Sequence, residues 1–288
     1  MPTFTVAIDS ARKLVPEYKF LKALTPSAQK AAFHVQDSDG RDLCLKIISP
    51  NVDPTDMVRI QREIKAMHEI VHAGVARFVD YEFTSRNGVV RHFTVEEFID
   101  GADLTHVLGT PWPLKKAVAF FLELAHGLGA IHAKQIIHRD LKPSNIRVKT
   151  SGAPVIIDFG MSRHLALPDI TQTFEGAQIG TPAYFAPEQW RNTKREIDER
   201  TDLFAFGVIM HTALVGSHPF MDGRPLTRQT LEAAICDSHD YQNKAAFAKL
   251  PDEVKTLVKW LLGKNRSDRP RYCEQMIEVL NKLSEGVK

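Results

Sequence analysis

Residues 138–145 read HRDLKPSN, residues 158–160 read DFG, and residues 186–188 read APE. One short string of this kind could arise by chance, whereas all three in this order and at these gaps are not expected in an unrelated chain. Taken singly, their polar residues could be helix caps and turn residues in loops. Their joint occurrence favours one functional motif that spans residues 138–188.

The composition narrows the class of protein. The 288 residues suit one large or two modest domains, and 43% apolar residues are enough to bury a core. With 37 basic and 35 acidic residues the formal charge is +2, which offers no electrostatic basis for binding nucleic acid or an anionic membrane. Cys44, Cys236 and Cys273 are few and unclustered, so we expect a reducing compartment and neither a disulfide framework nor a zinc site.

Targeting signals and metal-binding clusters are not evident in the sequence. No apolar run approaches the ~20 residues that span a bilayer, and the first residues, MPTFT, do not begin a signal peptide. We therefore expect a cytoplasmic protein without a membrane span. His92, His106 and His211 are scattered, so core or surface roles are expected for them and not metal ligation.

The three strings resemble the catalytic half of Ser/Thr protein kinases of the eukaryotic-like, bacterial type. The resemblance runs from about Tyr18 to Leu283 and leaves residues 1–17 as an N-terminal extension. It implies an α+β fold of two lobes, with a sheet-rich N-lobe with one helix (18–98), a hinge (97–103) and a larger helical C-lobe (104–288). It also implies transfer of the γ-phosphate of ATP, with Mg²⁺ or Mn²⁺, to Ser or Thr hydroxyls of protein substrates.

The hydrophobic pattern agrees with this division. Residues 54–72 carry apolar residues at steps of three and four, which predicts a helix with one buried face. Residues 43–48 and 93–99 are predicted strands. After Gly101 the pattern becomes helical, and it predicts helices at residues 114–133, 202–215, 252–262 and 272–283.

The resemblance implies a role for each polar residue of the central motif. Asp140 would accept or orient the proton of the substrate hydroxyl, and Lys142 would lie beside the γ-phosphate. Asn145 and Asp158 would hold the metal ions, since both supply the oxygen ligands that a hard divalent cation requires.

Four more residues match structural positions of the family. Thr181 lies in the segment of residues 180–188 that would receive the peptide, and would hydrogen-bond the catalytic Asp and Lys. Glu188 is expected to pair with Arg269, and Asp202 to anchor the backbone of the catalytic loop. These contacts would indicate that the lobe folds as in kinases. They would not indicate that the protein is catalytically active.

Arg139 directly precedes the catalytic Asp. A buried arginine there needs a counter-charge, which the family supplies by phosphorylating the loop between Asp158 and Glu188. That loop contains Thr171 and Thr173, and the resemblance predicts autophosphorylation at one of them. The alternative is that both are ordinary solvated threonines.

The nucleotide-binding half matches less closely. A lysine in an apolar strand is costly without an anion, and the resemblance implies that Lys46 binds the α- and β-phosphates with Glu63 as its partner. Glu63 could otherwise be a plain exposed helix residue. Glu97 and Ile99 would offer backbone hydrogen bonds to adenine, and Asp103 would reach the ribose hydroxyls.

The glycine-rich phosphate loop of the family is the main departure. The aligned residues 25–32 read TPSAQKAA and contain no glycine, so side chains restrict close approach of the backbone to phosphate. Either this loop binds phosphate less tightly, helped by the charge of Lys30, or ATP is not bound. The loop positions assigned to ATP are Thr25, Ser27, Lys30 and Ala32.

Three positions of the adenine pocket also deviate. Cys44 replaces the small roof alanine, Arg147 stands where an apolar floor residue is usual, and Glu96 falls at the gatekeeper position. Charged groups in a pocket must be satisfied, so Glu96 is expected to pair with Lys46 or with Arg147.

Two other functions remain as alternatives. The degenerate phosphate loop suggests a pseudokinase scaffold, although Lys46, Glu63, Asp140, Asn145 and Asp158 are all present and a non-catalytic module has no chemical need for them. A small-molecule phosphotransferase would share the motif around the catalytic Asp but would lack the segment of residues 180–188.

Overall fold

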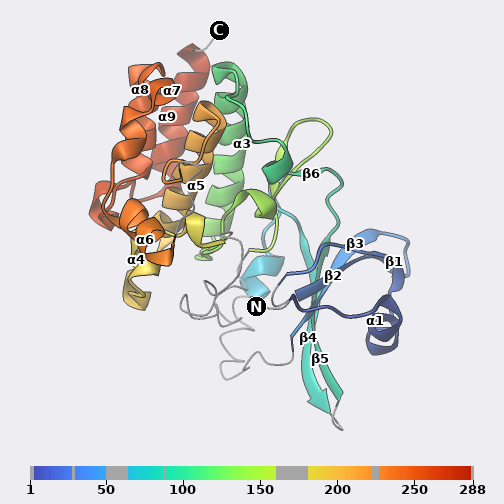
Figure 1. Ribbon diagram of the computed structural model, residues 1–288. Helices are drawn as coiled ribbons and strands as arrows, with labels where there is room; N and C mark the ends of the chain where they lie inside the picture. Colours follow the sequence, from blue (N-terminus) through green and yellow to red (C-terminus); the bar gives the residue numbers. More distant parts are fainter. Residues whose placement is uncertain are drawn as a thin grey trace.

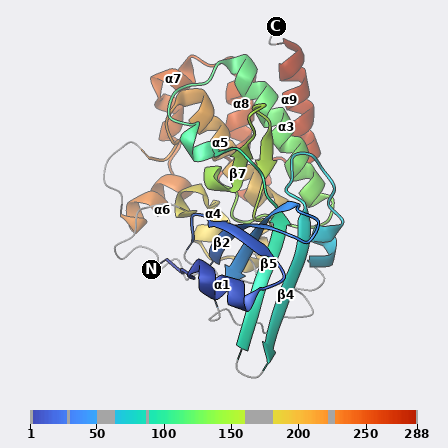
Figure 2. The ribbon, with the colours of Figure 1, turned by 90° about the vertical axis from the view of Figure 1, so that its right-hand side faces the viewer.

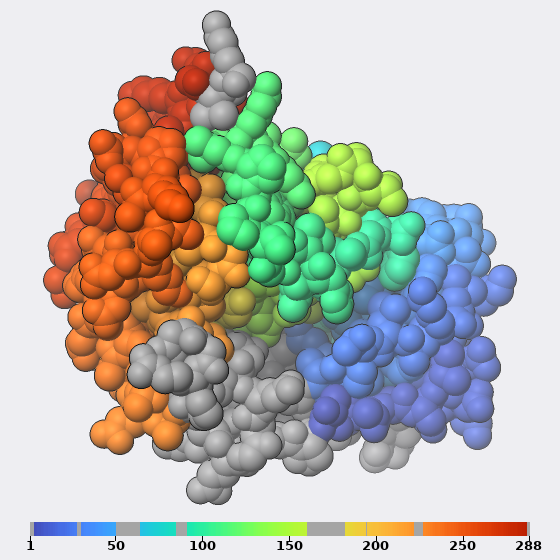
Figure 3. All heavy atoms as spheres, turned by 45° about the horizontal axis from the view of Figure 1, so that its top comes forward, coloured from blue at the N-terminus to red at the C-terminus, as the bar shows by residue number. Residues whose placement is uncertain are grey.

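The computed structural model describes residues 3–27, 30–49, 64–86, 89–159, 181–221 and 227–286. A sheet built from N-terminal residues lies beside a larger helical part (Figure 1). A view turned by 90° shows most of the helices gathered at one end, and the large sheet with one short N-terminal helix beside it at the other (Figure 2). In the space-filling view the N-terminal residues, in blue, lie next to the green-to-red remainder of the chain (Figure 3). The predicted α+β architecture of two lobes is confirmed.

Five antiparallel strands form the N-lobe sheet, in the order β1-β2-β3-β5-β4. Their bounds are β1 (Lys19–Ala23), β2 (Lys30–Gln36), β3 (Asp42–Ile48), β4 (Phe78–Arg86) and β5 (Val89–Glu97). Buried and half-buried side chains alternate along β2, because one face of the strand packs on the lobe core. The two predicted strands are confirmed as β3 and β5, but β5 ends two residues before the predicted limit at Ile99.

Helix α1 (Ile8–Leu14) packs beside β1 (Figure 1). Ala11 and Val15 are 0% exposed and belong to the same apolar core as Phe33 and Leu45 of the sheet. Although the sequence resemblance does not include residues 1–17, α1 contributes to the N-lobe core, because the apolar face of a sheet must be covered by another element.

The predicted helix of residues 54–72 is described only in its last part. Residues 64–68 are helical, and the chain leaves the helix at Glu69, earlier than predicted. Ile64, Met67 and Ile70 are 1–3% exposed and pack on the C-lobe core. Residues 54–63, Glu63 among them, lie outside the described residues.

The C-lobe contains a small sheet and a set of helices. The antiparallel strands β6 (Ala102–Asp103), β7 (Ile146–Val148) and β8 (Pro154–Ile156) form the sheet. The α-helices are α3 (Leu114–His132), α4 (Pro187–Trp190), α5 (Glu199–Val215), α6 (Arg228–Cys236), α7 (Ala245–Ala248), α8 (Asp252–Leu261) and α9 (Cys273–Gly286). Short 3-10 helices are η1 (Leu104–His106), η2 (Pro143–Asn145), η4 (Thr181–Tyr184), η5 (Lys194–Glu196), η6 (Asp240–Asn243) and η7 (Arg266–Asp268). The four helices predicted after Gly101 are confirmed as α3, α5, α8 and α9.

Helix α5 runs through the middle of the C-lobe (Figure 1 and Figure 2). Every residue from Thr201 to Val215 is buried, and α5 contacts α3 and α8. It begins earlier than predicted, because the side chain of Asp198 caps it by accepting a hydrogen bond from Arg200 N at 3.0 Å. It ends at Gly216, whose φ of +77° suits a glycine cap.

The small sheet positions the candidate site. The catalytic loop (residues 138–145) leads into β7, and β8 leads directly to Asp158. Ala76 N donates to Ile156 O at 2.9 Å, so the segment before β4 is tied to β8. The loop and Asp158 are therefore held at the junction of the two lobes.

Candidate active site

The backbone of the catalytic loop is held by a buried carboxylate. Asp202, in the first turn of α5, is 1% exposed. It accepts hydrogen bonds from His138 N and Arg139 N, both at 2.8 Å, and lies 2.9 Å from His132 Nε2. Burial alone would raise the pKa of Asp202, but the hydrogen bond and charge of His132 hold it below its ordinary value. An ionised carboxylate thus ties the loop to α5, the position that the sequence resemblance gives to Asp202.

Two residues of the site adopt left-handed backbone conformations. Arg139 has a φ of +64° and Asp158 a φ of +62°. Such angles are unfavourable for non-glycine residues and persist where the surroundings enforce them, often at active sites. Gln189 Nε2 donates to Arg139 O at 2.8 Å, and His138 Nε2 lies 3.1 Å from Ile157 O. These contacts hold both strained positions in place.

Asp140, Lys142 and Asn145 converge, as the motif predicts for one site. Asn145 Nδ2 donates to Asp140 O at 2.8 Å and to Asp140 Oδ2 at 3.1 Å. Lys142 Nζ lies 2.8 Å from the same Oδ2. Asp140 Oδ1 is buried and accepts no hydrogen bond from any of the described residues. One carboxylate oxygen is therefore engaged, and the other has no hydrogen-bond partner among the described residues. The backbone of Thr181 begins η4, while its side chain lies outside what the structure describes.

Asp158 lies between two lysines. Lys30 Nζ is 2.5 Å and Lys46 Nζ is 3.1 Å from Asp158 Oδ1. Although burial opposes ionisation, these two ammonium groups hold the pKa of Asp158 far below its ordinary value. The same carboxylate charge, with that of Glu96, outweighs the effect of burial on Lys46 and raises its pKa. These contacts therefore favour the charged forms of Asp158 and Lys46.

Lys46 also forms a buried ion pair with Glu96. Lys46 Nζ donates to Glu96 Oε1, and the two residues are 4% and 8% exposed. Of the two partners expected for Glu96, the structure shows Lys46. The expected partner of Lys46, Glu63, lies outside the described residues.

Arg147 contacts residues of the hinge and not Glu96. Arg147 Nη1 donates to Asp103 Oδ1 at 2.6 Å, and Nη2 donates to Gly101 O. The pairing follows from the β6–β7 register, in which Asp103 lies opposite Arg147. The carboxylate expected to reach the ribose is therefore joined to the guanidinium at the expected pocket floor.

The hinge leaves a limited set of backbone groups for a base. Glu97 N donates to Arg77 O at 2.8 Å, so only the carbonyl of Glu97 can serve a ligand. Ile99 lies two residues after Glu97 and is 6% exposed. Cys44, at the expected roof, is 8% exposed, and burial raises the pKa of its thiol to about 12, so it is uncharged.

The segment that replaces the glycine-rich loop joins β1 to β2. Ser27 N donates to Lys30 O at 2.8 Å, and Lys30 N donates to Ser27 Oγ at 3.1 Å. These two amides are used within the loop, whereas a glycine-rich loop points its amides at phosphate. Thr25 is exposed, and Ala32 lies opposite Lys46 in the β2–β3 ladder. Among the described loop residues, only the side chain of Lys30 reaches Asp158.

The comparison with known protein families accounts for this geometry. The family model of the protein kinase domain matches residues 30–280. The chain belongs to the protein kinase family. Its N-lobe sheet and helical C-lobe are the two lobes of the kinase fold, and the resemblance inferred from the three motifs is confirmed.

Curated relatives are bacterial Ser/Thr kinases. The chain is 30% identical over 267 residues to the DNA damage-responsive serine/threonine-protein kinase RqkA of Deinococcus radiodurans, a match that covers 90% of this chain and 38% of RqkA. It is 34% identical over 255 residues to the serine/threonine-protein kinase pkn2 of Myxococcus xanthus, covering 85% of this chain and 30% of pkn2. The serine/threonine-protein kinase PknB of Mycolicibacterium smegmatis is 28% identical, with 85% and 39% covered. The chain thus spans less than half the length of these relatives.

The described residues offer few candidate metal ligands. Within the described ranges, no three or more His, Cys, Asp or Glu side chains gather into a metal-binding group. Ile157 N donates to Asn145 O at 3.0 Å, which places Asn145 next to the residue before Asp158. The Asn145 amide and the Asp158 carboxylate offer hard oxygen ligands, and Mg²⁺ commonly takes one or two such ligands with phosphates and water. The donor set therefore fits a hard divalent metal ion bound together with phosphates.

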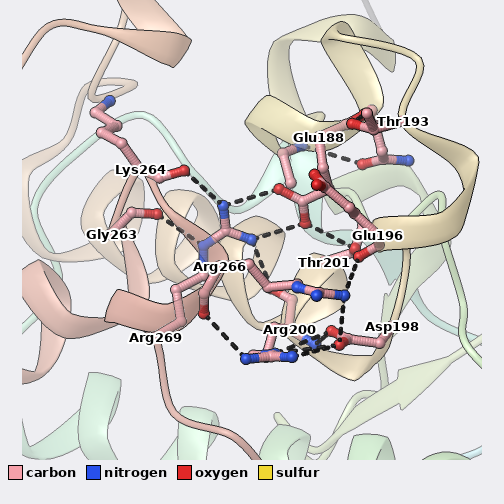
Figure 4. A network of polar contacts seen from close by, with 12 residues as sticks. Glu188, Thr193, Glu196, Asp198, Arg200, Thr201, Gly263, Lys264, Arg266 and Arg269 are labelled. Atoms are coloured by element: carbon pink, nitrogen blue, oxygen red, sulfur yellow. Dashed lines mark hydrogen bonds and ion pairs between the residues drawn. The ribbon is translucent and has the colours of Figure 1, made fainter.

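A buried ion pair connects distant parts of the kinase C-lobe (Figure 4). Arg269 Nη1 and Nη2 donate to Glu188 Oε1 and Oε2 at 2.8 and 2.9 Å. Thr201 Oγ1 donates to Glu188 Oε1 at 2.8 Å, and Arg269 Nε donates to Gly263 O at 2.7 Å. This pair, expected from the sequence, fixes the start of α4 and hence the end of the segment of residues 180–188.

Several contacts of the site were not anticipated from the sequence. Among them, His132 binds Asp202, Gln189 binds the Arg139 carbonyl, Lys30 binds Asp158, and Arg147 binds Asp103. No local pattern signals them, because each joins elements that are brought together only by the packed fold.

His211 of α5 makes acid stability a testable property. It is 0% exposed, and its Nδ1 lies 3.1 Å from Ser217 O. Burial, with the nearby charge of Lys244, lowers the pKa of His211 to about 4. The unfolded chain, with a histidine pKa of about 6.5, binds a proton at higher pH than the folded chain does.

Stability is therefore expected to fall as the pH drops below about 6.5. A single histidine of this kind contributes a loss of about 2 kcal/mol between pH 7 and pH 5. Urea unfolding at both pH values measures this loss, which should be smaller in His211→Phe. An equal loss in the wild type and in this variant would contradict the assignment.

The histidines scattered through the sequence thus include at least this one core residue. In the part of the chain that the structure describes, no helix has both the length and the apolar character needed to cross a membrane.

Proposed function

We propose that this chain is an ATP-dependent protein kinase that transfers the γ-phosphate of ATP to Ser or Thr hydroxyls of protein substrates. The observation that carries the proposal is the arrangement of Asp140, with one oxygen held by Lys142 and Asn145 and the other without a partner among the described residues. The bacterial Ser/Thr kinases to which the chain is similar support it.

Asp140 Oδ1 accepts the proton of the substrate hydroxyl. At the same time the hydroxyl oxygen of the substrate bonds to the γ-phosphorus of ATP, and the bond between that phosphorus and ADP breaks. Lys142 balances the negative charge on the transferred group. Asn145 and Asp158 hold the metal ions, which neutralise the developing charge on the phosphates when bound. In this structure the ammonium groups of Lys30 and Lys46 contact Asp158. Nucleotide phosphates would compete for these two lysines and so would free Asp158 to hold a metal ion.

Lys46 and Lys30 bind the phosphates in this proposal. Thr25, Ser27 and Ala32 contribute little to phosphate binding. The amide of Ser27 already donates to the carbonyl of Lys30, and the amide of Lys30 donates to the hydroxyl of Ser27. Glu97 and Ile99 offer backbone groups to the adenine. Cys44 and Arg147 lie at the edge of the adenine site. To bind the ribose hydroxyls, Asp103 must either release Arg147 or accept hydrogen bonds from both.

We further propose that the kinase autophosphorylates at Thr171 or Thr173. Both lie outside the described residues, and the proposal rests on the sequence between Asp158 and Glu188 and on Arg139 beside the catalytic Asp. Arg139 is half-buried and not fully buried as expected, and a phosphothreonine in that loop would supply an anion that its guanidinium group can bind.

Labelled ATP with Mg²⁺ tests these proposals. Wild-type protein is expected to label itself and a Ser/Thr-containing protein substrate, with phosphate on Ser or Thr, while Asp140→Asn is not. Peptide mapping should place label on Thr171 or Thr173. Unmodified threonines in active enzyme would remove the autophosphorylation proposal alone.

A pseudokinase scaffold is the second candidate. It is favoured by one observation: Asp158, Asp103 and two amides of the phosphate loop are all engaged by the protein's own groups. A protein that neither takes up label nor shows a thermal shift with Mg·ATP would support the scaffold.

The phosphate role of Lys30 gives a separate prediction. Lys30→Met is expected to weaken Mg·ATP binding about tenfold, since one of two cations at the site is lost. Titration calorimetry measures the affinity, and Lys19→Met, an exposed lysine on β1, is the matched control. Equal affinities in Lys30→Met and Lys19→Met would show that Lys30 does not bind phosphate.

A further inference from the structure

Two inner strands of the N-lobe sheet carry a buried ion pair that the family resemblance does not assign. Cys44 lies opposite Glu96 in the β3–β5 ladder, and Lys46 lies opposite Thr94. Side chains two residues apart on a strand share a face, so Lys46 and Glu96 are diagonal neighbours on one face of the sheet. The hydrogen bond from Lys46 to Glu96 therefore follows from the register of the sheet.

Neither strand is at an edge. β3 lies between β2 and β5, and β5 lies between β3 and β4. Ladder hydrogen bonds on both sides fix the two backbones, and a slip of one residue would move Glu96 to the opposite face. The carboxylate is thus held relative to the ammonium group by the sheet itself.

The charges around Lys46 alternate in sign. Glu96, Lys46, Asp158 and Lys30 follow one another in contact, and their formal charges sum to zero. If Asp158 held a metal ion, Lys46 would lose one of its two carboxylate contacts. Glu96 then remains as a buried counter-charge, without which a buried ammonium group is costly.

We propose that Glu96 is the positioning residue of Lys46 and keeps it directed at the nucleotide phosphates, the part that the resemblance gives to Glu63. The inference rests on the proposed kinase function and adds a residue to it. Because both partners belong to one sheet, the orientation of Lys46 does not depend on the placement of a helix.

A double-mutant cycle on nucleotide affinity tests the inference. Titration calorimetry with Mg²⁺ and a non-hydrolysable ATP analogue should show about tenfold weaker binding in Glu96→Gln than in the wild type. In a Lys46→Met background the same substitution should change nothing, because a residue that acts through Lys46 has nothing left to orient. Glu96→Asp keeps the charge and should lose only about threefold.

The controls separate positioning from stability. Asp39→Asn removes an exposed N-lobe carboxylate, 73% exposed, and should bind like the wild type. Urea unfolding shows whether each variant is folded. If Glu96→Gln does not fold, Glu96→Asp replaces it in the test. The loss of nucleotide affinity in Glu96→Asp should then disappear in the Lys46→Met background.

Several results would overturn the inference. These are wild-type affinity in Glu96→Gln, an equal loss in both Lys46 backgrounds, and a loss seen in Glu63→Gln but not in Glu96→Gln. A wild-type protein that binds no nucleotide would give a different pattern. It would count against the proposed function itself and remove the inference with it.

Discussion

Asp140→Asn is expected to lower kcat by about a thousandfold, because general base catalysis and orientation of the hydroxyl contribute about 10²–10⁴-fold. The substitution preserves size and keeps an oxygen at the position that Asn145 and Lys142 contact. What it removes is the carboxylate that accepts the proton. Nucleotide affinity should change little, since in the proposal the phosphates are bound by Lys46 and Lys30.

Steady-state kinetics on a protein substrate measure this effect, with the melting temperature as the test of folding. Asp39→Asn, on the N-lobe surface, should keep wild-type kcat and shows that the loss is specific. A kcat within a few-fold of the wild type in folded Asp140→Asn would remove Asp140 from the chemistry.

Arg269→Ala is expected to lower the free energy of unfolding by about 3–5 kcal/mol, the usual cost of removing one partner of a buried ion pair. The side chain of Arg269 is 0% exposed and that of Glu188 4% exposed, so the remaining carboxylate would stay buried without its bidentate partner. Urea unfolding measures the change. Arg269→Lys should recover only part of the loss, because an ammonium group cannot donate in the same forked geometry.

Arg271→Ala is the matched control for this prediction. Arg271 is exposed and lies over the ring of Tyr272, with 5.1 Å between the guanidinium carbon and the ring centroid. Its removal should change stability by no more than about 0.5 kcal/mol. The paired replacement of Arg269 and Glu188 by Met should be much milder than Arg269→Ala, since no charge is then left unpaired. If Arg269→Ala and Arg271→Ala unfold alike, the buried pair does not stabilise the lobe.

Much of the fold was predictable because its signals are local. The helical periodicity of residues 114–133 and 252–262 needs no information from elsewhere in the chain, and the structure shows α3 and α8 there. Boundaries were less accurate, because they depend on caps. The side chain of Asp198 starts α5 before the predicted residue, and the strand β5 ends at Glu97 where the chain turns into the hinge.

The packing of the first residues was not predictable in the same way. The helix of residues 8–14 is short, and a short isolated helix is marginal in water. It is stable here because Ala11 and Val15 are buried against the sheet. That burial depends on a surface formed by strands that follow it in the chain.

The sequence by itself determined which chemical groups are available: a motif with Asp140, Asn145 and Asp158, a glutamate and an arginine at positions 188 and 269, and a loop without glycine. Motifs of this kind are read from neighbouring residues. Only the tertiary structure decided which charges meet. Lys46 faces Glu96 because of the register of β3 and β5, and Lys30 reaches Asp158 across 128 positions of the chain. The strength of an ionic contact depends on distance and burial in space, and neither is set by separation along the chain.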